Sequence, residues 1–378
     1  MHAFAAMNII STKEVNQMRK IGLQEIDDIA RGASLLGSGG GGDPYIGRLI
    51  AMRAVKECGP AALIEPDDVP DDALIVPIAM MGAPTVLVEK AIGLHEFQKL
   101  FDMVSRFFNK KIYAFMPMEA GGLNSMMPIA ASARMHLPFV DADGMGRAFP
   151  ELQMVTFTIG GVSASPMALV DEKGNSVIFE TITNKWTEEL ARSVTMSCGG
   201  AVSCSLYPMD GRTLKKYGVK GIVTRSEKLG RAIRSAKESK HPQETFLQEC
   251  NAIRLFQGKI TDVRRENNGK FNLGHVLLDG QGEDTGSKGQ VTFMNENYLF
   301  AKDGKILATT PDLITIVDRD TFTPIGTDAV RYGKRVLVVG LPCYPLWRTK
   351  EGIALAGPRV FGIDEDYIPL EQRVQEAK

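Results

Sequence analysis

Short apolar runs alternate with helical patterns through the first part of the chain. Residues 73–80 and 111–116 are runs of aliphatic, β-branched and aromatic residues of strand length, and each is typical of a buried strand. Residues 94–108 place apolar side chains on one face of a helix, which predicts an amphipathic helix. This alternation predicts an α/β domain with a mostly parallel sheet.

The segment from residue 111 to residue 142 predicts a complete strand–helix–strand unit. Its first strand ends at Pro117, residues 123–135 are apolar almost all round, and residues 139–142 read as the next strand. The two strands of such a unit run parallel, so their carboxyl ends meet at one edge of the sheet. Open α/β sheets bind ligands in the crevice at that edge.

A glycine-rich loop separates two predicted helices near the N-terminus. The first helix follows a capping-box sequence at 11–14 and ends near residue 36. Residues 37–42 contain five glycines. Asp43 and Pro44 then supply a cap and a first helical residue for a second helix, which we expect to run to about residue 58.

The pattern changes after residue 150, where short strands and tight turns become dominant. Strands are predicted at 154–159, 167–171 and 176–183, and again from residue 254 onward. We therefore predict two domains. Residues 1–165 form an α/β domain with the Gly-rich loop and the carboxylates described below, and residues 166–378 form a β-rich domain with a helical insertion at about 184–251.

Length, charge and cysteine content favour a cytoplasmic protein. A chain of 378 residues is long enough for two cores. The formal net charge of -1 argues against nucleic acid or an anionic membrane as the main partner. We expect no membrane span, because every apolar run is shorter than the roughly 18–20 residues required, and no signal peptide. Five cysteines, an odd number, imply at least one free thiol and a reducing compartment.

Three carboxylates follow the strands of the predicted unit. Glu119 comes just after the first strand, and Asp141 and Asp143 lie at the end of the second. We expect all three to share one pocket and to be catalytic, because a Glu and a D-x-D pair can hold a divalent metal, orient a water or act as general base. Asp141 and Asp143 are the expected ligands of a metal such as Zn or Mg. Turn chemistry is the alternative for these residues.

Residues near these acids are candidates for substrate binding. An arginine beside them can anchor a substrate carboxylate or simply neutralise the acids, and the asparagine can cap the helix or donate to a substrate carbonyl. The glycines can bring their amides to a small anionic or carbonyl-bearing ligand, or form only a helix–turn–helix hinge. Nucleotide binding is disfavoured, because a helix precedes them and Gly-Lys-Ser/Thr is absent. These candidates are Gly39, Gly40, Gly41, Gly42, Asp43, Gly121, Gly122, Asn124 and Arg147.

The cysteines are weaker candidates. Cys198 and Cys204 are separated by five residues, a spacing that no common zinc knuckle uses, so close packing of small residues is the main alternative to a paired thiol site. Cys343 lies in a Pro-Cys-Tyr-Pro sequence at the end of a predicted strand. A rigid, accessible thiol there can be a nucleophile, although no histidine is near in sequence.

Four motifs together resemble one bacterial and archaeal family. They are LGSGGGGDP at 36–44, MEAGG-N at 118–124, DADGMGRAFPE at 141–151 and GLPCYPLWRTKEG at 340–352. The family consists of S-methyl-thiohydantoin desulfurase-like proteins associated with hydantoin utilisation. The resemblance implies an N-terminal α/β domain, a C-terminal β-rich domain and action on five-membered cyclic ureides or thioureides. It assigns no catalytic residue.

Two functions are therefore expected. The first is a hydrolase or desulfurase of a hydantoin-type ring, in which a carboxylate, alone or through a metal, activates water and loop amides stabilise the developing charge. The second is a non-catalytic or ligand-binding subunit of a hydantoinase/oxoprolinase-type complex, because the chain shows no complete triad and no unambiguous metal set. We expect a cyclic amide or thiohydantoin ligand and a homo-oligomer.

Overall fold

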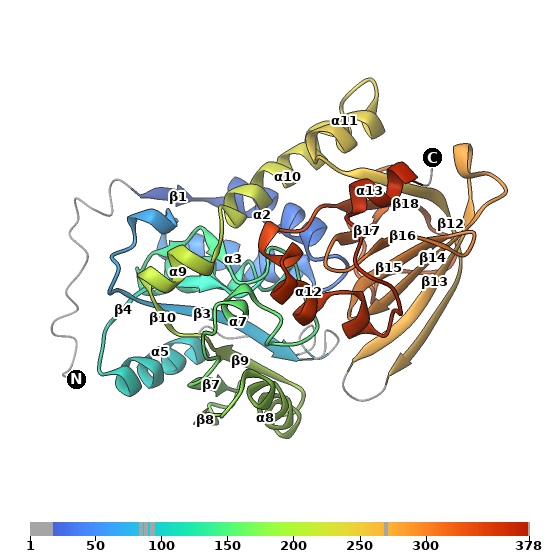
Figure 1. Cartoon of the computed structure of the whole chain (residues 1–378). Helices are drawn as coiled ribbons and strands as arrows, with labels where there is room; N and C mark the ends of the chain where they lie inside the picture. Colours follow the sequence, from blue (N-terminus) through green and yellow to red (C-terminus); the bar gives the residue numbers. More distant parts are fainter. Residues whose placement is uncertain (1–17, 83–85, 87–89, 91–94, 268–270, 377–378) are drawn as a thin grey trace.

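Two sheets of different construction organise the molecule (Figure 1). The computed structural model describes residues 18–82, 86, 90, 95–267 and 271–376, and these residues form a nine-stranded mixed sheet, a seven-stranded antiparallel sheet and a two-stranded ladder. The mixed sheet carries helices and lies in the N-terminal part, whereas the antiparallel sheet builds the C-terminal part. The predicted fold class is confirmed.

The centre of the mixed sheet is parallel and its ends are antiparallel. Strands β2, β5, β4 and β3 run parallel in that order, β1 joins one end, and β9, β7 and β8 extend the other. The strands are β1 (Arg19–Ile21), β2 (Ala61–Ile64), β3 (Leu74–Gly82), β4 (Ile112–Pro117), β5 (Phe139–Val140), β7 (Met167–Val170), β8 (Ser176–Phe179), β9 (Ala201–Ser205) and β10 (Met209–Asp210), which pairs with β3.

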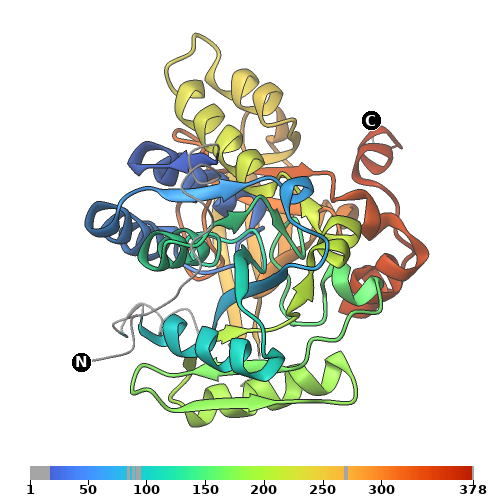
Figure 2. The same ribbon diagram turned by 90° about the vertical axis from the view of Figure 1, so that its left-hand side faces the viewer.

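Helices cover this sheet, and the amphipathic patterns explain why. In α5 the apolar stripe is buried, and Phe101 stacks on Phe115 of β4 with ring centroids 4.2 Å apart. Figure 2 looks onto this part of the molecule. The helices are α2 (Leu23–Leu36), α3 (Pro44–Cys58), α5 (His95–Phe108), α6 (Met127–Met135), α7 (Thr156–Ile159), α8 (Asn184–Ser197), α9 (Gly211–Tyr217), α10 (Ile222–Ala236) and α11 (Pro242–Glu249).

The C-terminal sheet has the order β16-β15-β14-β13-β12-β18-β17 and is antiparallel throughout. Its buried side chains form a separate hydrophobic cluster. Its strands are β12 (Ile253–Asn267), β13 (Asn272–Gly280), β14 (Lys288–Met294), β15 (Glu296–Lys302), β16 (Lys305–Thr309), β17 (Leu313–Asp318) and β18 (Arg335–Leu341), followed by α12 (Lys350–Ala356) and α13 (Leu370–Glu376).

Three local expectations need correction. Residues 19–21 form β1 rather than a helix, because they pair with the open edge of β2; the capping-box sequence at 11–14 lies outside the described residues. Residues 156–159 are helical rather than a strand, since Thr156 is fixed by hydrogen bonds to the Gly144 carbonyl. The helix expected from residue 123 begins at Met127, after a series of turns.

The first sheet takes strands from both sides of the expected domain boundary at 165/166. Strands β7 and β8 follow that boundary, and β9 lies within the expected helical insertion, yet all three belong to the mixed sheet. The boundary itself stays a prediction. In the part of the chain that the structure describes, no helix combines the length and the apolar character that crossing a bilayer requires.

Candidate functional site

Glu119 lies just beyond the end of β4, in a buried polar setting. The Asn124 side-chain amide donates to Glu119 Oε1 over 2.6 Å, while Asn124 Oδ1 accepts from the Met80 N–H of β3 at 2.8 Å. Asn124 therefore links β3 to the acid and does not cap α6. Burial raises the pKa of Glu119 to about 7, against the opposing effect of hydrogen bonds from Asn124 and the Phe149 N–H. Glu119 keeps 8% of its surface exposed.

Asp143 is the second acid and is completely buried. It ends β6 (Ala142–Asp143), and its Oδ1 accepts from the amides of Met145 and Gly146 at 3.2 and 2.8 Å. Its Oδ2 has no hydrogen-bond partner among the described residues. Burial raises the pKa of Asp143 well above its ordinary value, and the charge of Glu119 raises it further. The structure thus brings Glu119 and Asp143 together, as the sequence predicted.

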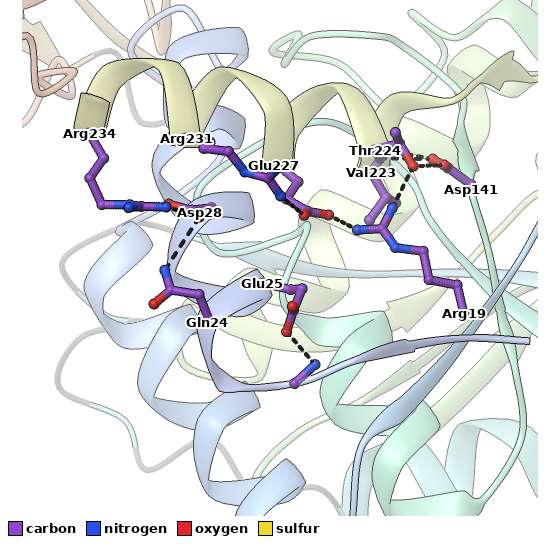
Figure 3. Close-up of polar contacts among 11 residues, drawn as sticks. Arg19, Gln24, Glu25, Asp28, Asp141, Val223, Thr224, Glu227, Arg231 and Arg234 are labelled. Carbon is purple, nitrogen blue, oxygen red and sulfur yellow. Dashed lines mark hydrogen bonds and ion pairs between the residues drawn. The ribbon is translucent and has the colours of Figure 1, made fainter. Parts of the chain in front are cut away.

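Asp141 is not brought to this pair. Its Oδ1 accepts from the amides of Val223 and Thr224 at 2.7 and 3.2 Å, and its Oδ2 accepts from the Thr224 hydroxyl (Figure 3). These are the first-turn donors of α10, where a carboxylate is favoured by free amides and by the helix dipole. Burial raises the pKa of Glu65, and the nearby Asp141 raises it further. Asp141 is therefore a helix cap supplied from a distant part of the chain.

Glu296 is a third buried acid, which the sequence analysis missed. It begins β15, and its Oε2 has no hydrogen-bond partner in the described structure. Burial raises its pKa well above the ordinary value, the charge of Glu119 adds to this rise, and Arg147 opposes it. Gly40 lies directly against Glu296, since a Cβ at Gly40 would be 2.0 Å from Glu296 Oε1. A charged residue at the start of the strand Glu296–Lys302 was its only sequence signal.

The Gly-rich loop crosses the second glycine turn at very short range. A Cβ at Gly41 would lie 2.3 Å from the Cα of Gly121, so neither residue can carry a side chain. Gly41, with φ of 76°, accepts from the Leu123 amide at 2.9 Å. Gly39 accepts from the Thr327 amide of the C-terminal part at 2.9 Å. The loop therefore joins α2 to α3 and also lies between the two sheets, beside the acids.

The other loop candidates have structural contacts. Asp43 caps α3 by accepting from the Tyr45 amide at 2.8 Å, as the sequence predicted for a helix start. Gly122 packs against the Gly42 carbonyl and Pro44. By contrast, the amides of Gly41 and Gly42 donate to no group among the residues that the structure describes. These two amides remain available to a ligand.

Arg147 is occupied by the C-terminal part of the molecule. Its Nη1 donates to the carbonyls of Pro311 and Asp312 at 2.9 and 2.8 Å, and its Nη2 donates to the Asn297 carbonyl at 3.3 Å. The guanidinium also lies 4.4 Å from the centroid of the Phe149 ring. Burial lowers the pKa of Arg147 to about 10, so it stays positive at neutral pH. These contacts favour the neutralising role over the carboxylate anchor.

The cysteines show no activated thiol. All five are free, with no disulfide. Cys204 donates its thiol to the Ala79 carbonyl at 3.3 Å, and burial raises its pKa to about 12. Burial and the nearby Asp312 raise the pKa of Cys343 to about 12 as well, so its thiol is protonated at neutral pH. Cys198 ends α8 and forms no pair with Cys204.

The expected metal site gains no geometric support. Within residues 18–82, 86, 90, 95–267 and 271–376, no group of three or more His, Cys, Asp or Glu side chains is arranged to hold a metal ion. Both oxygens of Asp141 already accept hydrogen bonds from α10. A divalent ion at Asp141 and Asp143 therefore remains a prediction.

Comparisons with known proteins identify the family. The models described as S-Me-THD-like N-terminal and C-terminal domains match residues 24–181 and 182–370. The crystal structure of a Chromobacterium violaceum protein is similar, with a TM-score of 0.77, 22% sequence identity and coverage of 93% of this chain and 100% of that chain; at this identity the likeness shows the fold alone. No curated protein matches the chain. The chain belongs to the S-methyl-thiohydantoin desulfurase-like family.

Proposed function

We propose that the protein is a hydrolase of the desulfurase type, which acts on a five-membered cyclic ureide or thioureide such as an S-methyl-thiohydantoin. Membership of the family supports the substrate class. The chemistry is supported by one observation above all: two buried carboxyl groups, Glu119 and Asp143, lie together at the end of the parallel strands, and burial raises the pKa of each. Their surroundings differ, since Glu119 keeps 8% of its surface exposed and Asp143 none, and different environments divide base and acid roles between two similar groups.

Glu119 is the general base in this proposal. With a pKa of about 7 it is substantially ionised at neutral pH yet basic enough to accept a proton from water. It is also the member of the pair that retains some exposure, whereas Asp143 has none. Water therefore adds to the ring carbon that bears the S-methyl group while Glu119 takes one of its protons.

Asp143 is the general acid, because complete burial raises its pKa and so favours its protonated form. The carbon–sulfur bond breaks, sulfur takes the Asp143 proton and leaves as methanethiol, and the remaining hydroxyl proton moves to the ring nitrogen. The products are a hydantoin and methanethiol, and proton transfer from Glu119 to Asp143 restores the starting state. The free amides of Gly41 and Gly42 can stabilise negative charge as the intermediate forms.

The test is turnover by the purified chain alone. An S-methyl-thiohydantoin is the substrate, and released thiol and hydantoin are measured. Glu119→Gln and Asp143→Asn should each lower kcat by about 100-fold or more, the usual loss for a general acid or base. Glu180→Gln, at an exposed carboxylate, is the matched control. Wild-type rates in both site variants would refute the assignment, and activity only after adding a hydantoinase- or oxoprolinase-type subunit would favour the non-catalytic alternative.

Removal of metal tests whether Asp141 and Asp143 act as metal ligands, as the sequence predicted. Carboxylate catalysis by Glu119 and Asp143 uses only their protons, so dialysis against a chelator should leave kcat within about two-fold of the untreated enzyme. Loss of activity that Zn²⁺ or Mg²⁺ restores would instead establish a metal-activated water. Metal analysis of the purified protein, run in parallel, shows whether the untreated sample carried an ion.

A further inference from the structure

Arg225 stands out among the arginines of α10. It is partly buried, and its side chain makes no hydrogen bond or ion pair with any residue in the described structure. On the same helix, Arg231 pairs with Glu227 and Arg234 pairs with Asp28 (Figure 3). No guanidinium nitrogen of Arg225 is among the fully buried unpartnered atoms of the described residues, so solvent reaches its donors and they are free to bind a ligand.

The chain places Arg225 beside the acid pair. Strand β6 pairs with β11 (Val219–Lys220) so that Asp143 lies opposite Val219, and Asp141 binds the two amides that immediately precede Arg225. Burial lowers the pKa of Arg225, and Asp143 opposes this effect when its carboxyl group is ionised. The two side chains form no ion pair. Asp143 Oδ2 also lacks a partner among the described residues, so each has unused bonding capacity.

The proposed reaction needs a positive charge at this place. When water adds to the S-methyl-bearing carbon, the electron pair moves to the ring nitrogen and onward to the adjacent ring carbonyl oxygen. Three carboxyl groups, Glu119, Asp143 and Glu296, oppose such a charge if they are ionised. Arg147 cannot donate to the substrate oxygen, because its donors are already bonded to backbone carbonyls. A guanidinium with free donors suits that oxygen.

We propose that Arg225 binds the carbonyl oxygen of the cyclic amide ring and holds the negative charge that develops there, next to the proton donor Asp143. The inference rests on the proposed function and adds its substrate requirement: a ring carbonyl conjugated with the carbon that water attacks. Arg225 thereby takes the substrate-binding role that the sequence suggested for Arg147.

Kinetics of two variants and one control test the proposal. Arg225→Gln should lower kcat for an S-methyl-thiohydantoin by about 100-fold, the loss expected for an oxyanion donor, with a smaller change in KM. Arg225→Lys should recover part of kcat, because it restores charge without the planar fork. Arg231→Gln, about 1.7 turns further along the same helix, should retain wild-type kcat. Wild-type kcat and KM in Arg225→Gln would overturn the proposal.

Thermal unfolding of the ligand-free protein separates this inference from the proposed function. Because Arg225 has no partner to lose, Arg225→Met should leave Tm unchanged or raise it, whereas a structural arginine would lower it by several degrees. A clear fall in Tm would overturn the inference even if the enzyme is active. If the wild-type chain converts no thiohydantoin, the proposed function fails, and the Tm of Arg225→Met then decides whether the arginine is an unpaired cation.

Discussion

At the scale of single residues, environment rather than residue type assigns the roles. Glu119, Asp141 and Asp143 are similar carboxylates, yet one is a buried group with a pKa near neutrality, one is a helix cap and one is a fully buried acid. The difference lies in the available donors: Asp141 accepts from the first turn of α10, whereas one oxygen of Asp143 has no partner among the described residues. Desolvation without compensating hydrogen bonds raises a carboxyl pKa.

The raised pKa of Glu119 predicts a pH-dependent stability. Between about 4.5, the ordinary pKa of an unfolded glutamate, and about 7, the folded state retains a proton that the unfolded state releases. Stability therefore falls as pH rises through this window and is lowest above it. Glu119→Gln removes the effect, and should raise the free energy of unfolding by up to about 3 kcal/mol at pH 8 but hardly at pH 4.5.

Urea unfolding at the two pH values measures this difference. Glu180→Gln, at an exposed carboxylate, should change the free energy of unfolding by the same amount at both pH values. Equal effects of Glu119→Gln at pH 4.5 and pH 8 would mean that Glu119 is not held protonated by burial, and would remove the basis for choosing it as the base.

At the scale of elements, sequence patterns correctly predicted the features that depend on interactions between near neighbours in the chain. The Asp43-Pro44 start fixed the helix Pro44–Cys58 as expected, because its cap bond is between near neighbours. Residues 19–21 were expected to be helical, but they extend the sheet through pairing with residues 61–63, which no local pattern reveals. The pairing of Asp141 with α10 likewise joins groups 82 residues apart. Long-range pairing accounts for most of the differences.

Site residues could be predicted only where chain connectivity brings them together. Glu119 and Asp143 were correctly expected at the same end of the sheet, because the parallel pairing of β4 with β5 follows from chain connectivity. Glu296 enters from the other sheet, and its contact with Gly40 depends on how the two sheets pack. Arg225 has no sequence signal at all, because its distinguishing property is a missing partner in the folded chain.

Replacement of Asp141 should affect stability more than catalysis. Asp141→Ala leaves the first-turn amides of α10 without an acceptor, and we expect it to cost about 1–2 kcal/mol, the range measured for capping residues. Thr183→Ala, which removes the cap of α8, is the matched control and should cost about 1 kcal/mol. Unfolding free energies and kcat are measured for both, with Asp143→Asn for comparison.

The opposite result would restore a catalytic Asp141. If Asp141→Ala unfolded at the wild-type denaturant concentration but lost kcat as fully as Asp143→Asn, its carboxylate would have to act on the substrate. The expected pattern is instead a clear loss of stability with kcat much less affected than in Asp143→Asn.

At the scale of the whole molecule, the candidate site lies where the two sheets meet. Glu119, Asp143 and the Gly-rich loop come from the N-terminal part, while Glu296 and the carbonyls that hold Arg147 come from the C-terminal part. Backbone bonds across the same joint, such as Thr327 N–H to the Gly39 carbonyl, fix the loop from the far side. The geometry of the acids therefore depends on the joint as well as on either sheet.

Arg147 is the residue on which this joint depends most directly. Arg147→Lys keeps a positive charge but cannot reach the Pro311, Asp312 and Asn297 carbonyls together, because an ammonium lacks the rigid fork of the guanidinium. Buried acceptors left unpaired cost about 1–3 kcal/mol each, so we expect a loss of about 3 kcal/mol and unfolding in two steps as the sheets separate.

The control variant Arg359→Lys, at an exposed arginine, should change neither the stability nor the number of unfolding steps. Denaturation followed by far-ultraviolet circular dichroism and by tryptophan fluorescence measures both; Trp347 near the joint and Trp186 of α8 both contribute to the fluorescence. Unchanged stability in Arg147→Lys together with a large rise in KM would mean that Arg147 binds the substrate, since only an arginine with free donors could do so. A loss of stability and activity together would mean that Arg147 holds the two sheets together through its hydrogen bonds.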